Sequence, residues 1–405
     1  MRRLLASFCA LGFALLSAWP AFASRKEVTD DVYIWQRRWT PALLSAMQMA
    51  LPVVKRWRVL AAEADPKGEW HTVKPDFEAL RVGNRQILAT IRIEGRSMPT
   101  ADMIPSLLGV IAAWRAAGVS PAALELDFDA PTSKLQGYAY FLRRLRPALP
   151  ADLPLVITAL PTWLNSKELP LLLAQADESV LQVHAVGTPY DGLFQPWQAR
   201  VWAHEFASRT DKPWRIALPS YGTRAVWNAQ GRLIAVDSEA SSLVAGDEAR
   251  ELFAAPKMVA GFRDELQAKP PKGFAGFVWF RLPTAEDRRA WSLDSFLIVL
   301  REAPLHEKIE RFMRQTPQPD VYDLFFRNTG NVDAVLPSQL EFAPRCDRGD
   351  GANGFRWRRT VTERYTASRL QRDGNDALRL RPGTMLPIGW IHCPPPETGP
   401  EAKKE

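Results

Sequence analysis

Residues 122–131 read AALELDFDAP, and this stretch decides the fold. Three apolar side chains alternate in it with three acidic ones, namely Leu124, Leu126 and Phe128 with Glu125, Asp127 and Asp129. The side chains of a strand point alternately to its two faces, so the three carboxylates share one face. Ionised groups are costly to bury. The stretch therefore predicts a strand with one apolar and one acidic face, and the acidic face needs a structural or functional reason.

The sequence around this strand alternates strand-like runs with helical stretches, which is typical of a parallel sheet. We expect eight strands, at residues 32–39, 57–64, 86–96, 122–130, 153–164, 179–187, 213–222 and 274–283. Helical stretches are expected at residues 41–55, 101–117, 132–146 and 286–301. Eight strands with intervening helices is the number in a (β/α)8 barrel. The sequence thus predicts an α/β protein whose barrel spans residues 30–305.

An insertion of about 50 residues, at 223–270, separates the seventh and eighth strands. It contains a hairpin pattern, AVWNAQGRLIAV at 225–236, in which Gly231 can adopt the left-handed conformation of the turn. Barrels build their sites from the loops after their strands. We therefore expect the insertion to form one wall of a cleft.

The last part of the chain has a different pattern. From about residue 317, short alternating segments are punctuated by turn signals such as Pro-Gly, which predicts a small β-sandwich over residues 317–393. Residues 394–405 are rich in proline and charge and are expected to be disordered.

The N-terminus has the pattern of a secretory signal peptide. Arg2 and Arg3 precede an apolar run at 4–19, and a small-x-small motif ends at Ala23, which predicts a signal peptide at 1–23. The run is too short to span a membrane comfortably, so no transmembrane anchor is expected after cleavage, although an anchored form is the alternative. The predicted location is the periplasm or the outside of the cell. A disulfide between Cys346 and Cys393 is plausible there.

Composition and motifs exclude several classes of function. The formal net charge is +7, which falls by two when Arg2 and Arg3 leave with the signal peptide, and the charge is spread along the chain. We expect no nucleic-acid partner, and a protein partner remains unknown. No G-x-S-x-G, phosphate-loop or H-E-x-x-H motif occurs, and the 5 histidines are scattered. No metal or cofactor is therefore expected.

Within a barrel, one face of every strand points to the axis. The apolar set of the acidic strand suits the helix-facing side, so Glu125, Asp127 and Asp129 are expected to point inward, with Asp129 at the C-terminal mouth. For Glu125 we expect a buried ion pair, for example with Arg92, and a hydrogen-bonded interior position for His184; both also count as candidates for substrate contact. Positions at the mouth carry the chemistry of barrels, which favours a functional role for Asp129.

The acidic strand resembles that of family 18 glycoside hydrolases, the chitinase-like barrels, which carry Asp-Gly-x-Asp-x-Asp-x-Glu on their fourth strand. Glu125 and Asp127 match its second and third acidic positions, and Asp129 falls where the family has its catalytic acid. LPSYG at 218–222 is similar to the seventh-strand motif, and Trp279 lies on the eighth strand, where those enzymes place a tryptophan under the sugar.

Over most of the mature chain the sequence is similar to a bacterial family described as domain of unknown function 3142. The stretches that carry this similarity are LDFDA and, one helix later, LVITALPTWL at 155–164.

The resemblance to chitinase-like enzymes implies that Asp129 donates a proton. Asp127 would then orient a 2-acetamido group of the substrate, which attacks in place of an enzyme nucleophile. Crowding by Asp127 is expected to raise the pKa of one carboxyl. The sequence departs from the pattern at Ala122 and Ala123, and Asp129 is one methylene shorter than the family's glutamate.

Other residues could complete the site. A second carboxylate could come from Glu94, Glu63 or Asp191, and Tyr190–Asp191 loosely resembles the Tyr-Asp of the chitinase-like sixth strand. Aromatic rings offer apolar faces to sugars, and five are expected at strand ends or in the loops beyond: Trp35, Trp163, Tyr190, Tyr221 and Trp279. Trp163 and Trp279 are the preferred sugar platforms, and Arg281 could hold a carboxylate or acetyl oxygen.

These observations favour an exported, glycoside-hydrolase-like protein that acts on a polysaccharide, which could contain N-acetylated sugars. Two alternatives stay open. The barrel could bind a glycan without cleaving it, if Asp129 is too short to act as the acid. The barrel and sandwich could instead form an envelope scaffold that serves a protein partner.

Overall fold

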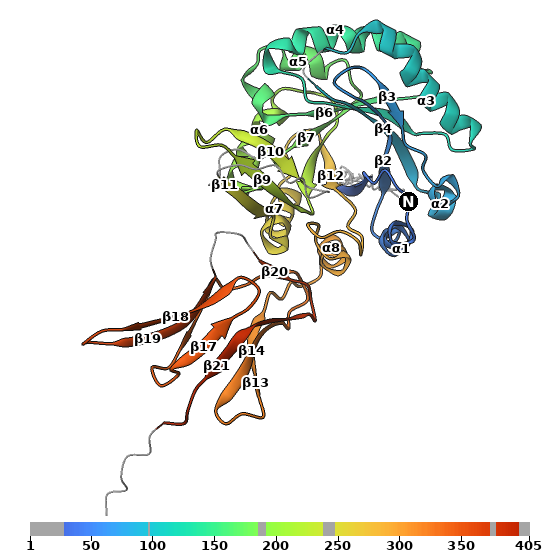
Figure 1. The fold of residues 1–405 in the computed structure, drawn as a ribbon. Helices are drawn as coiled ribbons and strands as arrows, with labels where there is room; N and C mark the ends of the chain where they lie inside the picture. Colours follow the sequence, from blue (N-terminus) through green and yellow to red (C-terminus); the bar gives the residue numbers. More distant parts are fainter. Residues whose placement is uncertain (1–27, 96–97, 185–191, 238–247, 373–377, 397–405) are drawn as a thin grey trace, which may run out of the picture.

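The protein is described here from a computed structural model, in residues 28–95, 98–184, 192–237, 248–372 and 378–396. It consists of a barrel of parallel strands surrounded by helices and a second region of antiparallel sheets (Figure 1). Trp279 and Leu218, from the eighth and seventh predicted strands, are partners in the sheet of the barrel.

Eight parallel strands close the barrel. In sheet order, β1 pairs with β12, followed by β8, β7, β6, β5, β4 and β2, and β2 pairs back with β1. Their bounds are Thr29–Ile34 (β1), Arg56–Ala64 (β2), Gln86–Ile93 (β4), Ala123–Phe128 (β5), Leu155–Ala159 (β6), Glu178–Gln182 (β7), Trp214–Pro219 (β8) and Phe274–Phe280 (β12). The predicted (β/α)8 barrel is confirmed. A short strand, β3 (Trp70–Thr72), adds antiparallel to the end of β2.

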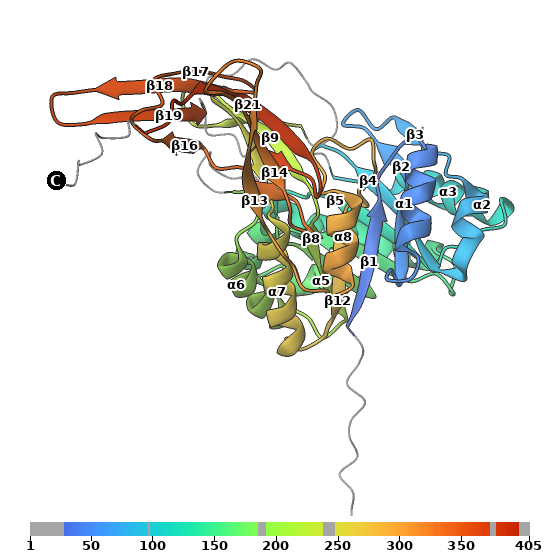
Figure 2. The ribbon, with the colours of Figure 1, turned by 90° about the horizontal axis from the view of Figure 1, so that it is seen from below.

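Helices cover the outside of the barrel (Figures 1 and 2). Their bounds are Pro41–Ala50 (α1), Phe77–Arg81 (α2), Ile104–Ala116 (α3), Leu135–Leu145 (α4), Leu169–Leu173 (α5), Pro196–Ala207 (α6), Pro256–Ala268 (α7) and Leu293–Leu300 (α8). Short 3-10 turns occur at Val82–Asn84, Ala101–Met103, Thr132–Lys134, Arg146–Ala148 and Pro161–Asn165.

The apolar face of β5 explains how the helices attach to the barrel. Leu124, Leu126 and Phe128 are fully buried, and the ring of Phe128 packs on Tyr138 of α4, with 5.1 Å between the ring centroids. The acidic side chains of the same strand must therefore point to the barrel axis, because successive side chains alternate.

The insertion between β8 and β12 contains a three-stranded antiparallel sheet followed by α7. Its strands are Gly222–Trp227 (β9), Leu233–Asp237 (β10) and Glu248–Phe253 (β11), with β9 in the middle. Gly231 has a φ of +68° in the turn between β9 and β10, the left-handed conformation that the sequence predicted. That the insertion forms the wall of a cleft stays a prediction.

The C-terminal region is built from antiparallel sheets in a sandwich-like arrangement. Its strands are Ile309–Gln315 (β13), Val321–Asn328 (β14), Ala334–Val335 (β15), Gln339–Phe342 (β16), Arg348–Gly351 (β17), Phe355–Val361 (β18), Thr366–Arg372 (β19), Arg379–Leu380 (β20) and Met385–His392 (β21). The sheets have the orders β13-β14-β21-β17, β16-β19-β18 and β15-β20. Figure 2 shows β18 and β19 projecting from the rest as a long hairpin.

An apolar core and a disulfide hold this region together. Leu324, Leu370 and Ile391 belong to one cluster and are fully buried. Cys346 and Cys393 are joined by a disulfide with an S–S distance of 2.00 Å.

The sandwich-like region is attached to the barrel through the segment between β12 and α8. Asp333 Oδ2 accepts a hydrogen bond from the backbone N–H of Ser292 at 2.6 Å. Arg379 donates to the carbonyl of Ala290 at 3.1 Å, and its guanidinium lies 4.4 Å from the ring centroid of Phe253 in β11. Arg381 donates to the carbonyl of Asp287. Since this segment follows the end of β12, the attachment lies on the side of the barrel mouth.

Within the residues that the structure describes, no helix combines the length and apolar character needed to cross a membrane. The predicted signal peptide lies outside these residues, and the expected export and location stay predictions.

Candidate functional site

The charged side chains of the barrel interior form two groups at different depths. The lower group surrounds Arg58, whose side chain is completely buried. Its guanidinium pairs with Asp31 at 2.9 Å, Glu125 at 2.8 Å and Glu178 at 2.5 Å. Glu125 also accepts a hydrogen bond from the hydroxyl of Tyr33. Every carboxylate of this group therefore has a cationic partner.

Two more arginines complete the lower group. Arg56 pairs with Asp31 at 2.7 Å and with Glu178 at 2.8 Å, and Arg215 pairs with Glu178 at 3.2 Å. Burial opposes ionisation of Glu178, but the charges of Arg58, Arg215 and Arg56 outweigh it and lower the pKa of Glu178 to about 2. The group is a balanced ion cluster.

Glu125 differs from the prediction in two respects. Its ion-pair partner is Arg58 of β2 and not Arg92, because β2 and β5 reach the same level of the barrel interior. Its burial is complete, which raises its pKa, and it lies against Tyr33. The prediction that Glu125 contacts substrate is therefore wrong, and its role is structural.

The upper group lies at the C-terminal end of β5. Asp127 is almost completely buried and accepts hydrogen bonds from three neighbouring strands. Arg92 Nη1 of β4 donates at 2.5 Å, Thr158 Oγ1 of β6 at 2.8 Å and Gln182 Nε2 of β7 at 3.3 Å. Together these donors fix the direction of the Asp127 carboxylate.

Asp129 follows the last residue of β5 and is the more accessible of the two carboxylates, with 41% of its side chain exposed. Its Oδ2 accepts a hydrogen bond from Arg92 Nη2 at 3.1 Å. Its Oδ1 is buried and has no hydrogen-bond partner in the described part of the chain. Burial and the negative charge of Asp127 raise the pKa of Asp129, against the opposing charge of Arg92. The mouth thus contains a carboxyl group that readily takes up a proton.

A neutral histidine and a tyrosine lie beyond β7 and β8. His184 Nδ1 is 3.2 Å from the hydroxyl of Tyr221, as hydrogen-bonded groups are. Burial lowers the pKa of His184 to about 4, so the ring is uncharged at neutral pH. Its Nε2 is buried and lacks a partner among the described residues. A buried polar atom of this kind is a candidate for a hydrogen bond to water or to a ligand.

Phe280 lies at the centre of the aromatic side chains of the mouth. Its ring contacts Trp35, Tyr221 and His184, with centroid distances of 5.2, 5.6 and 5.8 Å. Trp35 and Tyr221 were predicted at the mouth, whereas Phe280 was not. FAGFVWF is apolar on both faces, so its alternation does not distinguish Phe280 from Trp279.

Trp279 takes the opposite direction, and its prediction as a sugar platform is wrong. It is fully buried on the helix side, where its ring packs against Trp291 and against Phe296 of α8. Its indole N–H donates to Asp30 Oδ1 at 2.8 Å. Adjacent residues of a strand face opposite sides, so an inward Phe280 requires an outward Trp279.

Trp163 is not a platform either. It is fully buried in the 3-10 turn after β6, and its indole N–H donates to the carbonyl of Ala130 at 2.9 Å. It therefore joins two loops of the barrel and offers no face to a ligand.

The charged residues predicted to complete the site have other partners. Arg281 pairs with Asp287 at 2.5 Å, and its expected contact with a substrate oxygen stays a prediction. Glu63 binds Arg37 through both of its oxygens, at 2.6 Å each, and its role as a second carboxylate stays a prediction. Glu94 is half-buried just after β4, and its role stays a prediction. Tyr190 and Asp191 lie outside the described residues.

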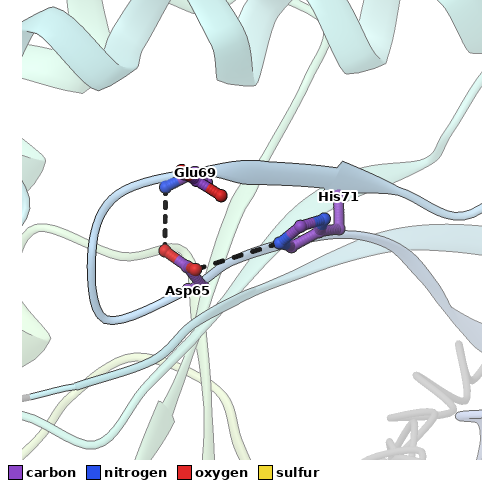
Figure 3. Close-up of side chains that lie close together, drawn as sticks. All are labelled: Asp65, Glu69 and His71. Atoms are coloured by element: carbon purple, nitrogen blue, oxygen red, sulfur yellow. Dashed lines mark hydrogen bonds and ion pairs between the residues drawn. The ribbon is translucent and has the colours of Figure 1, made fainter.

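Within the described residues, one group of side chains has the composition of a metal site. Asp65, Glu69 and His71 lie together where β2 turns into β3, with their ligand atoms within 4.8 Å of one another (Figure 3). Asp65 Oδ1 accepts hydrogen bonds from the backbone N–H groups of Lys67 and Glu69, at 2.8 and 2.9 Å, and this closes the turn. The hairpin accounts for Asp65 without a metal, and the expectation of a metal-free protein stays a prediction.

Two family models match the chain, one in the barrel and one in the sandwich-like region. The sequence model of a family described as domain of unknown function (DUF3142) matches residues 83–285, which is half of the chain and most of the barrel. A second, described as domain of unknown function (DUF8456), matches residues 311–394 of the sandwich-like region. No curated protein matches the sequence.

Solved structures with the same barrel include the spore cortex-lytic enzyme SleL of Bacillus megaterium. It has a TM-score of 0.50 and 12% identity, over 68% of this chain and 74% of that chain. SleL of Bacillus cereus has a TM-score of 0.48 and 13% identity, over 68% and 75% of the two chains. A chitinase of Chromobacterium violaceum has a TM-score of 0.48 and 12% identity, over 68% and 98%. At these identities the likeness shows the fold alone, which is glycoside-hydrolase-like.

Proposed function

The chain belongs to the DUF3142 family, and we propose that its glycoside-hydrolase-like barrel cleaves a polysaccharide with Asp129 as the general acid. One observation carries this proposal. Asp129 lies at the mouth of the barrel with a raised pKa and 41% of its side chain exposed. A general acid needs both features, because it must hold a proton and present it to the substrate.

The proposed reaction begins with proton transfer from Asp129 to the glycosidic oxygen. As the bond between that oxygen and the anomeric carbon breaks, positive charge develops on the carbon. The carbonyl oxygen of a substrate 2-acetamido group then bonds to the anomeric carbon. Water attacks the same carbon in the second step, releases the acetamido oxygen and returns a proton to Asp129.

Asp127 is the residue that we propose to orient the acetamido group. Three donors from β4, β6 and β7 hold its carboxylate in one direction, next to Asp129 on the same face of the strand. A carboxylate held in this way is preorganised to stabilise charge that develops in the transition state. The substrate class that follows is a polysaccharide with N-acetylated sugars.

The aromatic side chains of the mouth support binding of a sugar. Trp35, Tyr221 and His184 each contact Phe280, and His184 Nε2 has no partner in the described part of the chain. Aromatic faces pack on the C–H groups of a pyranose, and a neutral imidazole can hydrogen-bond its hydroxyls. We propose that these four residues surround the sugar next to Asp129.

A second function is favoured by one contact. Arg92 bonds Asp127 and Asp129 at once, at 2.5 and 3.1 Å, and this holds the shorter aspartate back on the strand. If the carboxyl cannot leave Arg92 to reach a glycosidic oxygen, the barrel binds a glycan without cleaving it.

The substitution Asp129→Asn distinguishes the two functions. Oligosaccharides of N-acetylglucosamine and solubilised peptidoglycan are incubated with the enzyme, and the released reducing ends are measured. We expect a loss of roughly 10²- to 10⁴-fold in rate, the range for a general acid. Asp152→Asn, which alters an exposed carboxylate paired with Arg115, is the matched control and retains full activity.

Full activity of the Asp129→Asn variant would contradict the assignment of the acid. Glycan binding by the wild type without any turnover, unchanged in the Asp129→Asn variant, would establish the binding function instead.

We further propose that the protein acts in the periplasm or outside the cell. The pattern of residues 1–23 supports export, and a disulfide such as Cys346–Cys393 persists in oxidising compartments. Fractionation of the source cells, with N-terminal sequencing of the mature chain, tests this. A chain that retains Met1 in the cytoplasm would contradict it.

A further inference from the structure

Trp390 of the sandwich-like region stands apart from the other tryptophans. Of the tryptophans in the part of the chain that the structure describes, only Trp197 and Trp390 are exposed, at 60% and 38%. The indole N–H of Trp197 donates to the side chain of Gln195 at 2.8 Å. Trp390 has no such hydrogen bond, and its ring has no aromatic neighbour among the described residues. The indole of Trp390 is thus partly open to a ligand.

The sheet places Trp390 in a row of polar side chains. Arg314 of β13 pairs with Asp323 of β14, Asp323 pairs with Trp390 of β21, and Trp390 pairs with Asp350 of β17. Cross-strand partners lie on the same face of a sheet. The next residue on β21, Ile391, is fully buried in the core, so this row lies on the outer face. The indole is therefore flanked by two carboxylates.

Both carboxylates are held in place and keep capacity to accept further hydrogen bonds. Asp323 Oδ2 accepts from Arg314 Nη2 at 3.0 Å, and Asp350 Oδ1 accepts from the backbone N–H of Gly351 at 2.8 Å. An ionised carboxylate can accept about four hydrogen bonds. The row thus offers fixed acceptors on either side of a flat apolar ring.

A cavity of about 380 Å³ lies beside this row. Trp390, Asp323 and Val321 line it, together with Thr316, Pro317 and Gln318 from the turn between β13 and β14. Figure 1 shows β13, β14 and β21 next to one another in this region. Its volume is at the lower end of the roughly 300–1,000 Å³ of small-molecule sites, which suits a short stretch of a larger chain.

We propose that this cavity is a second carbohydrate-binding site, which holds one or two sugar units of the polysaccharide. A pyranose packs its C–H groups on the indole of Trp390, and its hydroxyls donate to Asp323 and bond to the amide of Gln318. Asp323 lines the cavity and Asp350 flanks the indole, so we expect like-charge repulsion to disfavour uronates and phosphorylated sugars relative to neutral ones. The inference rests on the proposed function, because that function supplies the glycan.

The attachment of the sandwich-like region to the barrel links this second site to the proposed active site. Asp333, Arg379 and Arg381 hold the sandwich-like region to the segment after β12, on the side of the barrel mouth. Trp390 pairs with Asp323 close to the turn between β13 and β14, at the end of the sheet that lies away from this attachment. A polymer bound there stays tethered to the barrel, which raises its effective concentration without any new contact to the barrel. We expect Trp390 to increase the rate of cleavage of long polymers and not that of short oligosaccharides.

The test uses the full mature chain with Asp129→Asn to prevent cleavage. Binding of the hexamer of N-acetylglucosamine, of cellohexaose and of polygalacturonate is measured by calorimetry, with and without Trp390→Ala. We expect the neutral hexamers to bind and to lose roughly tenfold or more in affinity at this site in the Trp390→Ala variant. Trp197→Ala is the matched control and should bind as the parent does.

The Gln318→Ala variant is a second test of the site in case the Trp390→Ala variant does not fold. Gln318 is exposed in a turn, so its substitution should leave the fold intact. It should weaken binding of the same sugars to a smaller extent. Unchanged binding in both variants would overturn the proposal, as would equal losses in the Trp197→Ala variant or a preference for polygalacturonate. A change of oligomeric state in the Trp390→Ala variant, with no glycan binding by the parent, would assign this face to a protein contact and also overturn it.

The outcomes separate this inference from the proposed function. If the barrel is not an enzyme, binding that depends on Trp390 persists while no cleavage is seen in the chain with Asp129 intact. If the second site does not exist, cleavage that depends on Asp129 persists, and the Trp390→Ala variant degrades long polymers as fast as the wild type.

Discussion

The two ends of the barrel interior use the same kinds of side chain to opposite effect. In the lower group, three guanidiniums face three carboxylates: Arg56, Arg58 and Arg215 with Asp31, Glu125 and Glu178. At the mouth, and within the residues that the structure describes, Arg92 pairs with two carboxylates, Asp127 and Asp129. The lower group has as many guanidiniums as carboxylates, whereas this described part of the upper group has one guanidinium for two carboxylates.

This difference in charge balance affects the pKa values of the carboxyl groups. The arginines around Glu178 overcome its burial and lower its pKa to about 2. Burial and Asp127 raise the pKa of Asp129, because one shared arginine cannot offset both. The pKa of Glu125 is also raised by burial, but Glu125 is sealed in the interior, whereas 41% of the Asp129 side chain is exposed. A raised pKa together with exposure at the mouth makes Asp129 the candidate acid.

The largest effect is expected when the lower cluster loses its central cation. Arg58→Met removes the partner of Asp31, Glu125 and Glu178 from a completely buried position. We expect a loss of about 3–5 kcal/mol in the free energy of unfolding, the range for breaking a buried ion pair. Urea denaturation followed by circular dichroism measures it.

Arg115→Met provides the matched control, since Arg115 pairs with the exposed Asp152 at the surface. Its cost should stay within about 1 kcal/mol. Equal stability of the Arg58→Met variant and the wild type would show that the lower cluster does not hold the barrel together.

The second effect is a loss of stability in acid that depends on Glu178. Its folded pKa is about 2 against an ordinary value of 4.5, so the unfolded chain takes up the proton first as the pH falls. The stabilisation is complete above about pH 4.5 and disappears as the pH falls towards 2. The difference amounts to at most about 3 kcal/mol.

Glu178→Gln isolates this contribution. The free energy of unfolding is measured at pH 5 and at pH 3 for the wild type and the variant, and the wild type should lose more between the two. An identical loss in both proteins would mean that Glu178 ionises normally in the folded state.

The smallest effect on stability, and the most informative for function, is expected at the mouth. Arg92→Met should cost roughly 1–3 kcal/mol, because hydrogen bonds to charged groups are lost at a partly exposed position. The charge of Arg92 lowers the pKa of Asp129, so its removal should raise that pKa further.

Activity that needs protonated Asp129 falls as the pH rises through this pKa. The alkaline limb of the rate profile should therefore move to higher pH in the Arg92→Met variant, whatever happens to the maximum rate. A limb that stays in place or moves to lower pH would remove Asp129 from the role of proton donor.

The sequence was sufficient to find β5 and the order of its carboxylates. The alternation in LELDFD leaves one register for a strand with helices on its outside, and this puts Glu125, Asp127 and Asp129 at increasing height along one inward face. The division of roles between Glu125 and the two aspartates follows from that height alone.

The same reasoning failed on β12, where it chose Trp279 over Phe280. FAGFVWF is apolar on both faces, so its alternation does not indicate which side points inward. A register that is wrong by one residue exchanges the two faces of a strand, and a buried tryptophan was taken for a platform. Trp279 was preferred over Phe280 because tryptophan has the larger ring.

The barrel, the sandwich-like region and the acidic strand follow from local periodicity and turn residues, which can be read along the chain. The ion-pair partners depend on contacts that form only in the folded protein. Arg58 lies 67 residues before Glu125 and is brought next to it by the pairing of β2, β4 and β5. Arg92 pairs with both Asp127 and Asp129. The raised pKa of Asp129 and the position of Trp390 between two carboxylates result from neighbours brought together by sheet register, which no short stretch of sequence contains.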